Sequence, residues 1–317
     1  MSESRKTVAL VGGRGHVGAE LMQLLFAHPG FELILVSSRE FAGQPVGEHV
    51  AGAPPGLHFE AATALEVAAR EPDACILALP NGLAEPFVAA IDRPESETVI
   101  VDVSADYRFD NTWHYGLPEL NRPGLPVTRI SNPGCYATAM QLAIAPVAKL
   151  IAGAPHCFGV SGYSGAGTTP SPRNDPTRLR DNLMPYQPTG HLHEREVGFQ
   201  LHTAVRFTPH VAGFFRGISM TVGMELETRH TLTGILQRYQ DAYAGEPLVR
   251  VTEEIPEVAD NAGHHHACVG GFGLDREGRY LVAFATLDNL LKGAATQALQ
   301  NLNLACGYPE LEGIPNG

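Results

Sequence analysis

A cysteine that directly follows a tight turn has the clearest chemical potential in this sequence. Asn132, Pro133 and Gly134 form a turn signal, Cys135 comes next, and a helical pattern of apolar residues runs from 136 to 151. The free backbone N–H groups and the dipole at a helix start favour negative charge. A thiol placed there can ionise near neutral pH and act as a nucleophile. The alternative is an inert, buried cysteine, but the coincidence of turn, glycine and helix start favours the nucleophile.

A glycine-rich turn near the N-terminus has the pattern of a dinucleotide-binding site. An apolar run at 7–11 leads into Gly12, Gly15 and Gly18, and a helical stripe continues to about residue 27. Gly12 permits a tight turn, Gly15 lets the backbone approach a pyrophosphate, and Gly18 lets the helix pack on the strand. The phosphates would lie at the helix N-terminus. The cofactor contacts expected here are Gly12, Gly15, His16, Val17 and Gly18. A glycine-rich turn with no ligand is the alternative.

The second predicted strand, 33–36, ends in Ser37, Ser38 and Arg39. A site for NAD usually has an acidic residue at this place to bind the ribose hydroxyls, and none is present. Two hydroxyls and a guanidinium suit a 2′-phosphate instead. We therefore expect these residues to bind NADP rather than NAD, with an ordinary polar loop as the alternative.

The rest of the first half alternates predicted strands with predicted helices, which indicates an α/β fold with a doubly wound parallel sheet of the Rossmann type. The strands are expected at 75–79, 98–103 and 128–131, and the helices at 62–70 and 83–91. Ligands of such sheets bind beyond the carboxyl ends of the strands. Pro80 and Asn81 stand at one such end and Cys135 follows another. We therefore expect the nicotinamide and the thiol to share one crevice.

The second half has longer strand patterns and predicts a second, α+β catalytic domain with a largely antiparallel sheet. Its strands are expected at 157–163, 217–227, 269–274 and 280–288, with one helix at 232–243. A stretch rich in glycine and proline, 165–188, is expected to form a long loop over the site. The expected domains are an NADP-binding domain at 1–135, a catalytic and substrate-binding domain at 136–288, and a C-terminal helix at 289–317 that returns to the first domain.

An acyl-transfer thiol needs a partner that exchanges protons, and three groups of histidines compete for this role. They are the pair His191 and His193, the single His210, and the run 264–266. The run lies in a polar turn and is expected to be a solvated loop, and no second ligand cluster supports a metal site. Spacing alone does not choose between His191, His193 and His210.

Composition narrows the class of partner and the compartment. The chain has 317 residues, 34 of them acidic and 22 basic, with a net charge of −12. This balance argues against nucleic acid or an anionic membrane surface as a partner. Five irregularly spaced cysteines do not form a disulfide framework, and no apolar stretch approaches the length of a membrane span. We expect a cytoplasmic protein.

Taken together, these motifs resemble the N-acetyl-γ-glutamyl-phosphate reductase family of arginine biosynthesis, which is related to the aspartate-semialdehyde dehydrogenases. The similarity runs over nearly the whole chain. It is carried by residues 12–21, 101–109, 132–139, 163–167, 216–217 and 288–294. The pair His191 and His193 is similar to the family's His-Arg-His-x-Pro-Glu motif. In this chain Leu192 replaces the arginine of that motif and Arg195 replaces the proline, whereas Glu196 matches the glutamate.

The resemblance implies that Cys135 is the nucleophile, that His191 is the acid/base, and that the cofactor is NADP. The implied reaction is the NADPH-dependent reductive dephosphorylation of N-acetyl-γ-glutamyl phosphate to N-acetylglutamate semialdehyde through a cysteine thioester. The residues expected to contact substrate are Asn132, Arg108, His193, Ser164, Gly165 and Arg216, with Asn289 expected to contact the cofactor. Arg108 and Arg216 are candidates for the phosphate or the substrate carboxylate. Related enzymes suggest a homodimer or homotetramer.

Two alternatives remain open at this point. One is a reductase of a neighbouring acyl phosphate, such as an acylated aminoadipyl phosphate or aspartyl phosphate. The other is a dinucleotide-sensing regulatory protein that keeps the fold without the chemistry. Fast alkylation of Cys135 with protection by substrate would favour an enzyme.

Overall fold

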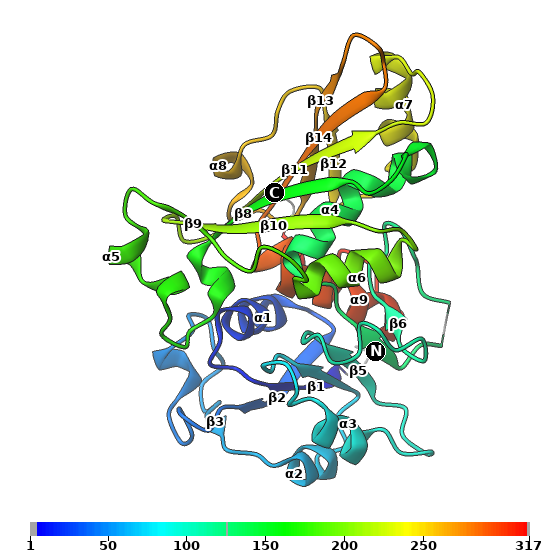
Figure 1. The fold of residues 1–317 in the computed structure, drawn as a ribbon. Helices are drawn as coiled ribbons and strands as arrows, with labels where there is room; N and C mark the ends of the chain where they lie inside the picture. Colours follow the sequence, from blue (N-terminus) through cyan, green and yellow to red (C-terminus); the bar gives the residue numbers. More distant parts are fainter. Residues whose placement is uncertain (1–4, 125, 316–317) are drawn as a thin grey trace. The chain divides into compact units, whose positions relative to one another are not determined.

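The computed structural model describes residues 5–124 and 126–315, and the chain divides into two compact units (Figure 1). The first unit contains the described residues up to Pro133 and those from Ala294 onward. The second unit runs from Gly134 to Gly293. Each unit is built around its own seven-stranded sheet.

The first unit has the expected doubly wound parallel sheet, with strand order β3-β2-β1-β4-β5-β7-β6. Its strands are β1 (Lys6–Val11), β2 (Phe31–Ser37), β3 (Phe59–Glu60), β4 (Ala74–Leu77), β5 (Val99–Asp102), β6 (His114–Tyr115) and β7 (Arg129–Ser131). Its helices are α1 (His16–Ala27), α2 (Ala64–Ala69), α3 (Glu85–Ile91) and α9 (Thr296–Cys306). Helices α1 and α9 pack together on one face and α2 and α3 on the other, as Figure 1 shows. Both faces of β1 and β4 are therefore buried, which explains their continuous apolar runs.

The second unit has a mixed sheet, with strand order β12-β13-β14-β11-β8-β10-β9. Its strands are β8 (His156–Gly162), β9 (Leu183–Pro185), β10 (Arg206–Ala212), β11 (Ile218–Glu225), β12 (Val249–Thr252), β13 (Ala267–Leu274) and β14 (Tyr280–Leu287). Its helices are α4 (Cys135–Ile144), α5 (Pro176–Leu179), α6 (Leu192–Gln200), α7 (Leu232–Ala242) and α8 (Val258–Asn261). The pairs β8–β10 and β12–β13 are parallel and the rest are antiparallel. Helices α4 and α7 cover one face of this sheet, where the core of the unit lies.

The structure corrects several predicted boundaries. The helix expected at 136–151 is α4, which ends at Ile144, followed by the 3₁₀ segment Ala145–Leu150. Pro146 explains the change, because it has no N–H for the helix and its ring crowds the preceding turn. The helix expected from 289 begins with a π-helical turn, Leu291–Ala295, and continues as α9. Strands β3, β6, β9, β10 and β12 were not expected from the sequence.

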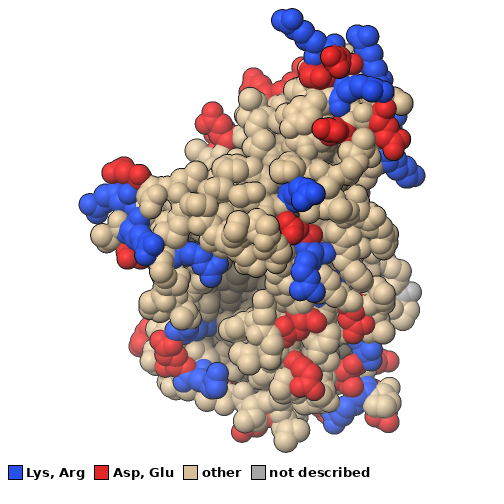
Figure 2. Space-filling view, viewed as in Figure 1, with Lys and Arg blue, Asp and Glu red and all other residues tan. Residues whose placement is uncertain are grey.

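On the face drawn in Figure 2, acidic and basic groups lie interspersed among uncharged residues. Within residues 5–124 and 126–315, no helix is both long and apolar enough to cross a bilayer.

Candidate active site

Cys135 is the first residue of α4, so the turn-then-helix arrangement expected from the sequence is present. Its side chain is half-buried. The residue before it, Gly134, is the N-cap and offers no side chain to the helix start. The Gly134 N–H instead donates to Oε1 of Glu196 at 2.9 Å, and this glutamate is fully buried on α6. The helix carrying the thiol is therefore linked to the helix that follows His191.

The neighbourhood of Cys135 is tight on its other side. A Cβ built on Gly293 would lie 2.8 Å from the Cβ of Cys135 and 3.1 Å from the Asp288 carbonyl oxygen. Real carbon atoms almost never approach so closely, so only glycine fits at position 293.

The other thiols lie in unreactive surroundings. Burial raises the pKa of Cys75 to about 12 and of Cys306 to about 11, and it also raises the pKa of Cys157 and Cys268. A thiol with a raised pKa has little thiolate at neutral pH, and the thiolate is the nucleophile. Of the cysteines, Cys135 alone begins a long helix with its side chain partly open to solvent.

Arg108 and Asn132 lie in the first unit and hold the turn that precedes Cys135. Nε of Arg108 donates to the Asn132 carbonyl at 2.8 Å, and Nη2 donates to the Val103 carbonyl at 2.9 Å. The Asn132 amide donates to the Ala294 carbonyl at 3.2 Å and accepts from Nδ2 of Asn301 at 3.0 Å. Both side chains are buried. The turn is thus fixed from both its backbone and its side chain.

His191 is the N-cap of α6 and is 9% exposed. Its Nδ1 accepts the backbone N–H of His193 at 3.1 Å. In the neutral ring Nδ1 then carries no proton, so the ring proton is on Nε2. Burial lowers the pKa of His191 to about 4, and the nearby positive charge of Arg173 adds to this effect while Glu194 opposes it. At neutral pH the imidazole is therefore an uncharged hydrogen-bond donor.

An aromatic cluster surrounds His191 in the second unit. Its ring centroid lies 5.1 Å from that of Phe207, 5.7 Å from Tyr186, 6.2 Å from Tyr136 and 5.0 Å from His193. The structure thus brings His191 and His193 together, beside the residue that follows the thiol. The contacts among these rings keep the imidazole in one orientation.

The other two candidates are His210, whose backbone contacts Tyr136 of this cluster, and the run 264–266. His210 is on β10, where its ring centroid lies 4.4 Å from that of Phe158 with the planes tilted by 41°, and its carbonyl accepts the Tyr136 hydroxyl at 2.6 Å. His266 is buried rather than solvated, which corrects the expectation of a solvated loop for that residue. In the part of the chain that the structure describes, no three His, Cys, Asp or Glu side chains are grouped to hold a metal ion.

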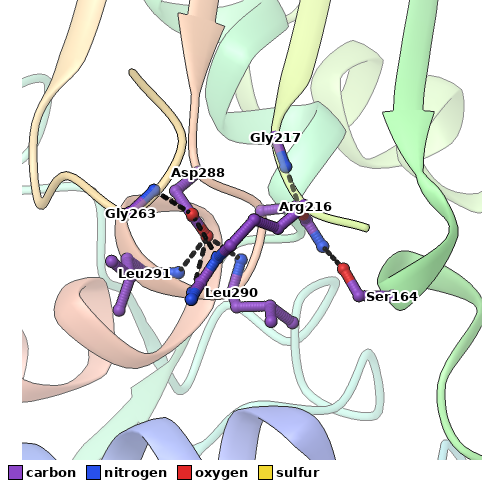
Figure 3. Close-up of polar contacts among 8 residues, drawn as sticks. Ser164, Arg216, Gly217, Gly263, Asp288, Leu290 and Leu291 are labelled. Atoms are coloured by element: carbon purple, nitrogen blue, oxygen red, sulfur yellow. Dashed lines mark hydrogen bonds and ion pairs between the residues drawn. The ribbon is translucent and has the colours of Figure 1, made fainter. Parts of the chain in front are cut away.

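Arg216 forms an ion pair with Asp288, which is fully buried at the end of β14 (Figure 3). Nε of Arg216 lies 2.5 Å from Oδ2, and Nη2 donates to Oδ1 at 3.2 Å. The same carboxylate accepts the backbone N–H groups of Gly263, Leu290 and Leu291, at 2.6, 2.8 and 3.1 Å. Asp288 therefore fixes both the guanidinium and the start of the π-helical turn.

Asn289 joins two segments of the second unit that the sequence assigned to substrate. Its Nδ2 donates to the Ser164 hydroxyl at 2.9 Å and its Oδ1 accepts the Gly217 N–H at 2.7 Å. Ser164 is buried, whereas Gly165 is exposed. The Asn289 amide is thus engaged with the loop that contains Ser164 and Gly165 and with the residue after Arg216.

The glycine turn of the first unit has the shape that a pyrophosphate site requires. Gly12 has φ +95°, and a Cβ there would lie 2.2 Å from the Ala78 carbonyl oxygen. A Cβ on Gly18 would lie 2.7 Å from the Gly12 carbonyl oxygen. A Cβ on Gly15 would meet nothing within 4 Å, and α1 begins there without a side-chain cap. His16 and Val17 form its half-buried first turn. The turn leaves open backbone at the helix start, which fits a dinucleotide phosphate.

The end of β2 and the residues that follow it contain the groups expected to bind the 2′-phosphate. The Ser37 carbonyl accepts the Gly12 N–H at 3.1 Å, which places this segment beside the glycine turn. The Ser38 hydroxyl accepts the Phe41 N–H at 3.2 Å. Arg39 is exposed and forms no ion pair with any described residue, whereas Glu40 is paired with Arg14. A cation is thus available while the nearest carboxylate is neutralised.

Pro80 and Asn81 are exposed in the loop after β4, and the loop after β5 holds them in place. Oδ1 of Asn81 accepts the Ala105 N–H at 3.0 Å. The Asp106 carboxylate accepts the N–H groups of Gly82 and Ala84, at 2.6 and 3.1 Å. These bonds tie two carboxyl-end loops of the sheet together, which is the place where such sheets bind ligands.

The sequence did not predict the roles of three side chains of the second unit: Arg173 and Tyr186 near His191, and Glu196, which contacts the start of α4. Arg173 and Tyr186 lie inside the stretch expected only to be a loop, and Glu196 was noted only as part of a motif. Each acquires its position through a contact between distant residues, for which a local pattern gives no signal.

Comparison with known proteins gives full-length matches. Residues 7–126 match the family profile described as "Semialdehyde dehydrogenase, NAD binding domain", and residues 135–289 match "Semialdehyde dehydrogenase, dimerisation domain". The chain is 58% identical over 317 residues to the N-acetyl-gamma-glutamyl-phosphate reductase of Stenotrophomonas maltophilia (strain R551-3), with all of both chains covered. It is 54% identical to the reductase of the same name from Xylella fastidiosa (strain M23), with 99% of this chain and 97% of that protein covered.

Solved structures share the fold at low sequence identity. Aspartate semialdehyde dehydrogenase II of Vibrio cholerae matches with a TM-score of 0.75 at 16% identity, over 96% of this chain and 99% of that one. The aspartate semialdehyde dehydrogenase of Candida albicans, solved with NADP, matches with a TM-score of 0.70 at 14% identity, over 95% and 99%.

Proposed function

Since this chain belongs to the N-acetyl-γ-glutamyl-phosphate reductase family, we propose that it reduces N-acetyl-γ-glutamyl phosphate to N-acetylglutamate semialdehyde and phosphate, a step of arginine biosynthesis. The observation that carries the proposal is Cys135 at the start of α4 in a chain matched over its whole length. The first unit would bind NADP and the second would bind the acyl phosphate.

The Cys135 thiolate forms a bond to the acyl carbon, and the bond from that carbon to the phosphate oxygen breaks, so phosphate leaves with the electron pair. The product is a thioester on Cys135, which divides one difficult step into two easier ones. NADPH, when bound, supplies the hydride that reduces this thioester. The C–S bond of the resulting hemithioacetal then breaks, which releases the aldehyde and restores the thiolate.

His191 would donate a hydrogen bond from Nε2–H to the oxygen that becomes negative in both tetrahedral states. This role agrees with an imidazole that is neutral and whose Nδ1 is already used by His193. Removal of one donor of this kind typically costs about 10²–10³-fold in kcat. The backbone N–H of Cys135 is a candidate second donor, and one such donor is worth about 3 kcal/mol.

The groups that would hold the cofactor lie in the first unit. The open backbone of Gly15, with His16, Val17 and the glycines on either side, would take the pyrophosphate. Arg39, with Ser37 and Ser38, would take the 2′-phosphate. Pro80 and Asn81 would also contact the cofactor, because their loop is held at the carboxyl end of the sheet. Asn289 would affect cofactor binding only indirectly, by holding the segments that contain Ser164 and Gly217 in place.

Arg216 is the candidate for the substrate carboxylate. Asp288 holds its guanidinium from one side, and the side chain is 25% exposed, so part of the fork faces solvent. Asn289 holds the neighbouring Ser164 and Gly217, so the substrate loop and Arg216 would form one surface. The buried Arg108 and Asn132 would support the site by fixing the turn before Cys135.

The assembly is proposed to be a homodimer or a tetramer built from such dimers, and a match to a dimerisation domain supports it. The face of the second sheet opposite α4 carries half-exposed apolar side chains, among them Phe158, Val160 and Phe284. An apolar sheet face of this kind is typical of a subunit interface. We propose the cytoplasm as its location, since a reducing compartment keeps the Cys135 thiol free.

A turnover assay tests the function directly. N-acetylglutamate semialdehyde, phosphate and NADP should give phosphate-dependent formation of NADPH, whereas the aminoadipate and aspartate analogues of the aldehyde should react at least about tenfold more slowly, the cost of losing one charge-assisted hydrogen bond. Cys135→Ser should abolish this activity, and Cys268→Ser, a change at another half-buried thiol, should not. More than about a tenth of the activity in Cys135→Ser would rule out the covalent mechanism.

A further inference from the structure

Arg173 is an exposed cation of the second unit to which the mechanism above assigns no task. It lies in the 3₁₀ turn Pro172–Asn174, and its Cζ is 4.9 Å from the centroid of the Tyr186 ring. A guanidinium at this distance is attracted by the face of the ring, so Tyr186 holds it in place. Within the described residues, Arg173 forms no ion pair with a carboxylate.

The backbone around Arg173 is fixed to the glycine-rich substrate loop. Nδ2 of Asn174 donates to the carbonyls of Gly167 and Thr169, each at 2.8 Å. Its Oδ1 accepts the Ser171 N–H at 2.7 Å. Arg173 therefore has a defined place beside the loop that contains Ser164, rather than one set only by its own side chain.

The charge of Arg173 reaches the reacting residues of the same unit. The Tyr186 ring on which it lies is 5.7 Å from the His191 ring. The charges of Cys135 and Arg173 both act on the pKa of Tyr186, the first raising it and the second lowering it, while burial raises it to about 12. Arg173 also lowers the pKa of His191. The cation thus lies on the ring that neighbours the imidazole, and the charge of the thiol acts on that same ring.

Neither of the two arginines considered from the sequence is a second candidate for the phosphate, because each has a protein partner and Arg216 is already the candidate for the carboxylate. Arg108 donates to the carbonyls of Asn132 and Val103, and Arg216 is paired with Asp288. A fixed cation near a nucleophile, with no acidic partner, is suited to an anion that arrives with the substrate.

We propose that Arg173, held against Tyr186, binds the phosphoryl group of the acyl phosphate. The inference rests on the proposed function and adds to it the residue that recognises the leaving group. A guanidinium can donate two parallel hydrogen bonds to phosphate oxygens. As the carbon–oxygen bond breaks, the electron pair moves onto the departing phosphate, and Arg173 stabilises the added charge.

The test uses the reverse reaction, in which inorganic phosphate is a substrate with its own KM. Arg173→Ala should raise the KM for phosphate about 10- to 100-fold, the loss expected for charge-assisted hydrogen bonds, and leave the KM for the aldehyde within about twofold. Arg178→Ala, a change at another exposed arginine, five positions further along the chain in α5, should leave both values within about twofold. Tyr186→Phe keeps the ring and should keep the phosphate KM, whereas Tyr186→Leu should raise it about fivefold.

A second readout needs neither cofactor nor turnover. Inorganic phosphate should slow the alkylation of Cys135 by iodoacetamide in the wild-type protein, and Arg173→Ala should abolish this protection. The assignment is wrong if Arg173→Ala changes neither the KM for phosphate nor the protection of Cys135 by phosphate. It is also wrong if only the KM for the aldehyde rises, because Arg173 would then bind the substrate carboxylate. A wild-type protein without phosphate-dependent turnover would refute the proposed function, and loss of phosphate protection in Arg173→Ala would then still support the anion site.

Discussion

Replacing His191 by asparagine separates two tasks that the structure gives to one side chain. The imidazole caps α6 by accepting the His193 N–H, and under our proposal its Nε2–H also stabilises the reacting oxygen. Asparagine is among the best N-cap residues, so His191→Asn should keep the first task and lose the second. Alanine at the same position should lose both.

The magnitudes of the two effects differ enough to be told apart. Loss of the cap costs about 1 kcal/mol, and removal of a ring that is 9% exposed and touches Phe207 and Tyr186 adds a packing loss of roughly 1–2 kcal/mol. His191→Ala should therefore unfold at a lower urea concentration than His191→Asn. Both variants should lose about 10²–10³-fold in kcat, the cost of one missing oxyanion donor.

The assay combines steady-state turnover with urea unfolding on the same preparations. His202→Asn is the matched control, because His202 is exposed after α6 and has φ +52°, a conformation that asparagine tolerates. It should change neither kcat nor stability. If His191→Asn keeps more than about a tenth of the wild-type kcat, the imidazole does not stabilise the reacting oxygen.

The same histidine has a definite pH dependence. Its pKa is lowered to about 4 in the folded protein, so the ring is neutral there at pH 6–8, and kcat/KM should show no inflection near pH 6.5 from this group. An inflection near pH 6.5 that disappears in His191→Asn would contradict the neutral donor. Because the folded pKa lies below the unfolded value of about 6.5, the contribution of the neutral ring to stability is complete above pH 6.5. That contribution is lost as the pH falls from 6.5 through about 4.

Three further predictions concern groups around the site. Arg39→Ala should raise the KM for NADPH about tenfold and change the KM for NADH less than about twofold; equal changes would exclude Arg39 as the 2′-phosphate contact. Glu196→Ala should lower the free energy of unfolding by about 1–3 kcal/mol because it leaves the buried Gly134 N–H without its acceptor, whereas Glu196→Gln should lose less; equal losses in a urea titration would argue against this bond. Asp288→Asn should lower stability by roughly 2–3 kcal/mol and raise the aldehyde KM by releasing Arg216, and an unchanged KM would remove Arg216 from the substrate site.

The sheet of the first unit could be predicted because its sequence signal is local. Val8 to Val11 and residues 74–77 are apolar without alternation, as strands buried on both faces must be, and glycines mark the turn after β1. Strand β10 could not be predicted in the same way. Pro209 lies within it and argues against a strand, yet β10 pairs with β8 over its whole length.

The candidate site likewise contains some residues that a local sequence pattern identifies and others that it does not. Cys135 was identified because turn, glycine and helix start are adjacent in the chain, and the glycine turn at Gly12 for a similar reason. The position of Arg173 depends on Tyr186, and the Gly134 N–H depends on Glu196 for its acceptor. Gly134 and Glu196 are 62 residues apart, and the sequence around one of them does not predict its contact with the other. Such contacts come from tertiary packing, which propensity and periodicity do not encode.

The close approach of Gly293 to Cys135 has a consequence for anyone who interprets natural variants or builds libraries of this enzyme. A change of glycine to alanine in a helical turn is usually regarded as harmless or even helpful. At position 293 it would place a methyl group only 2.8 Å from the carbon that carries the sulfur, so one of the two would have to shift. A mutation that alters neither charge nor polarity could therefore silence the enzyme as fully as loss of the cysteine, and a scan that ranks substitutions by chemical similarity would overlook it.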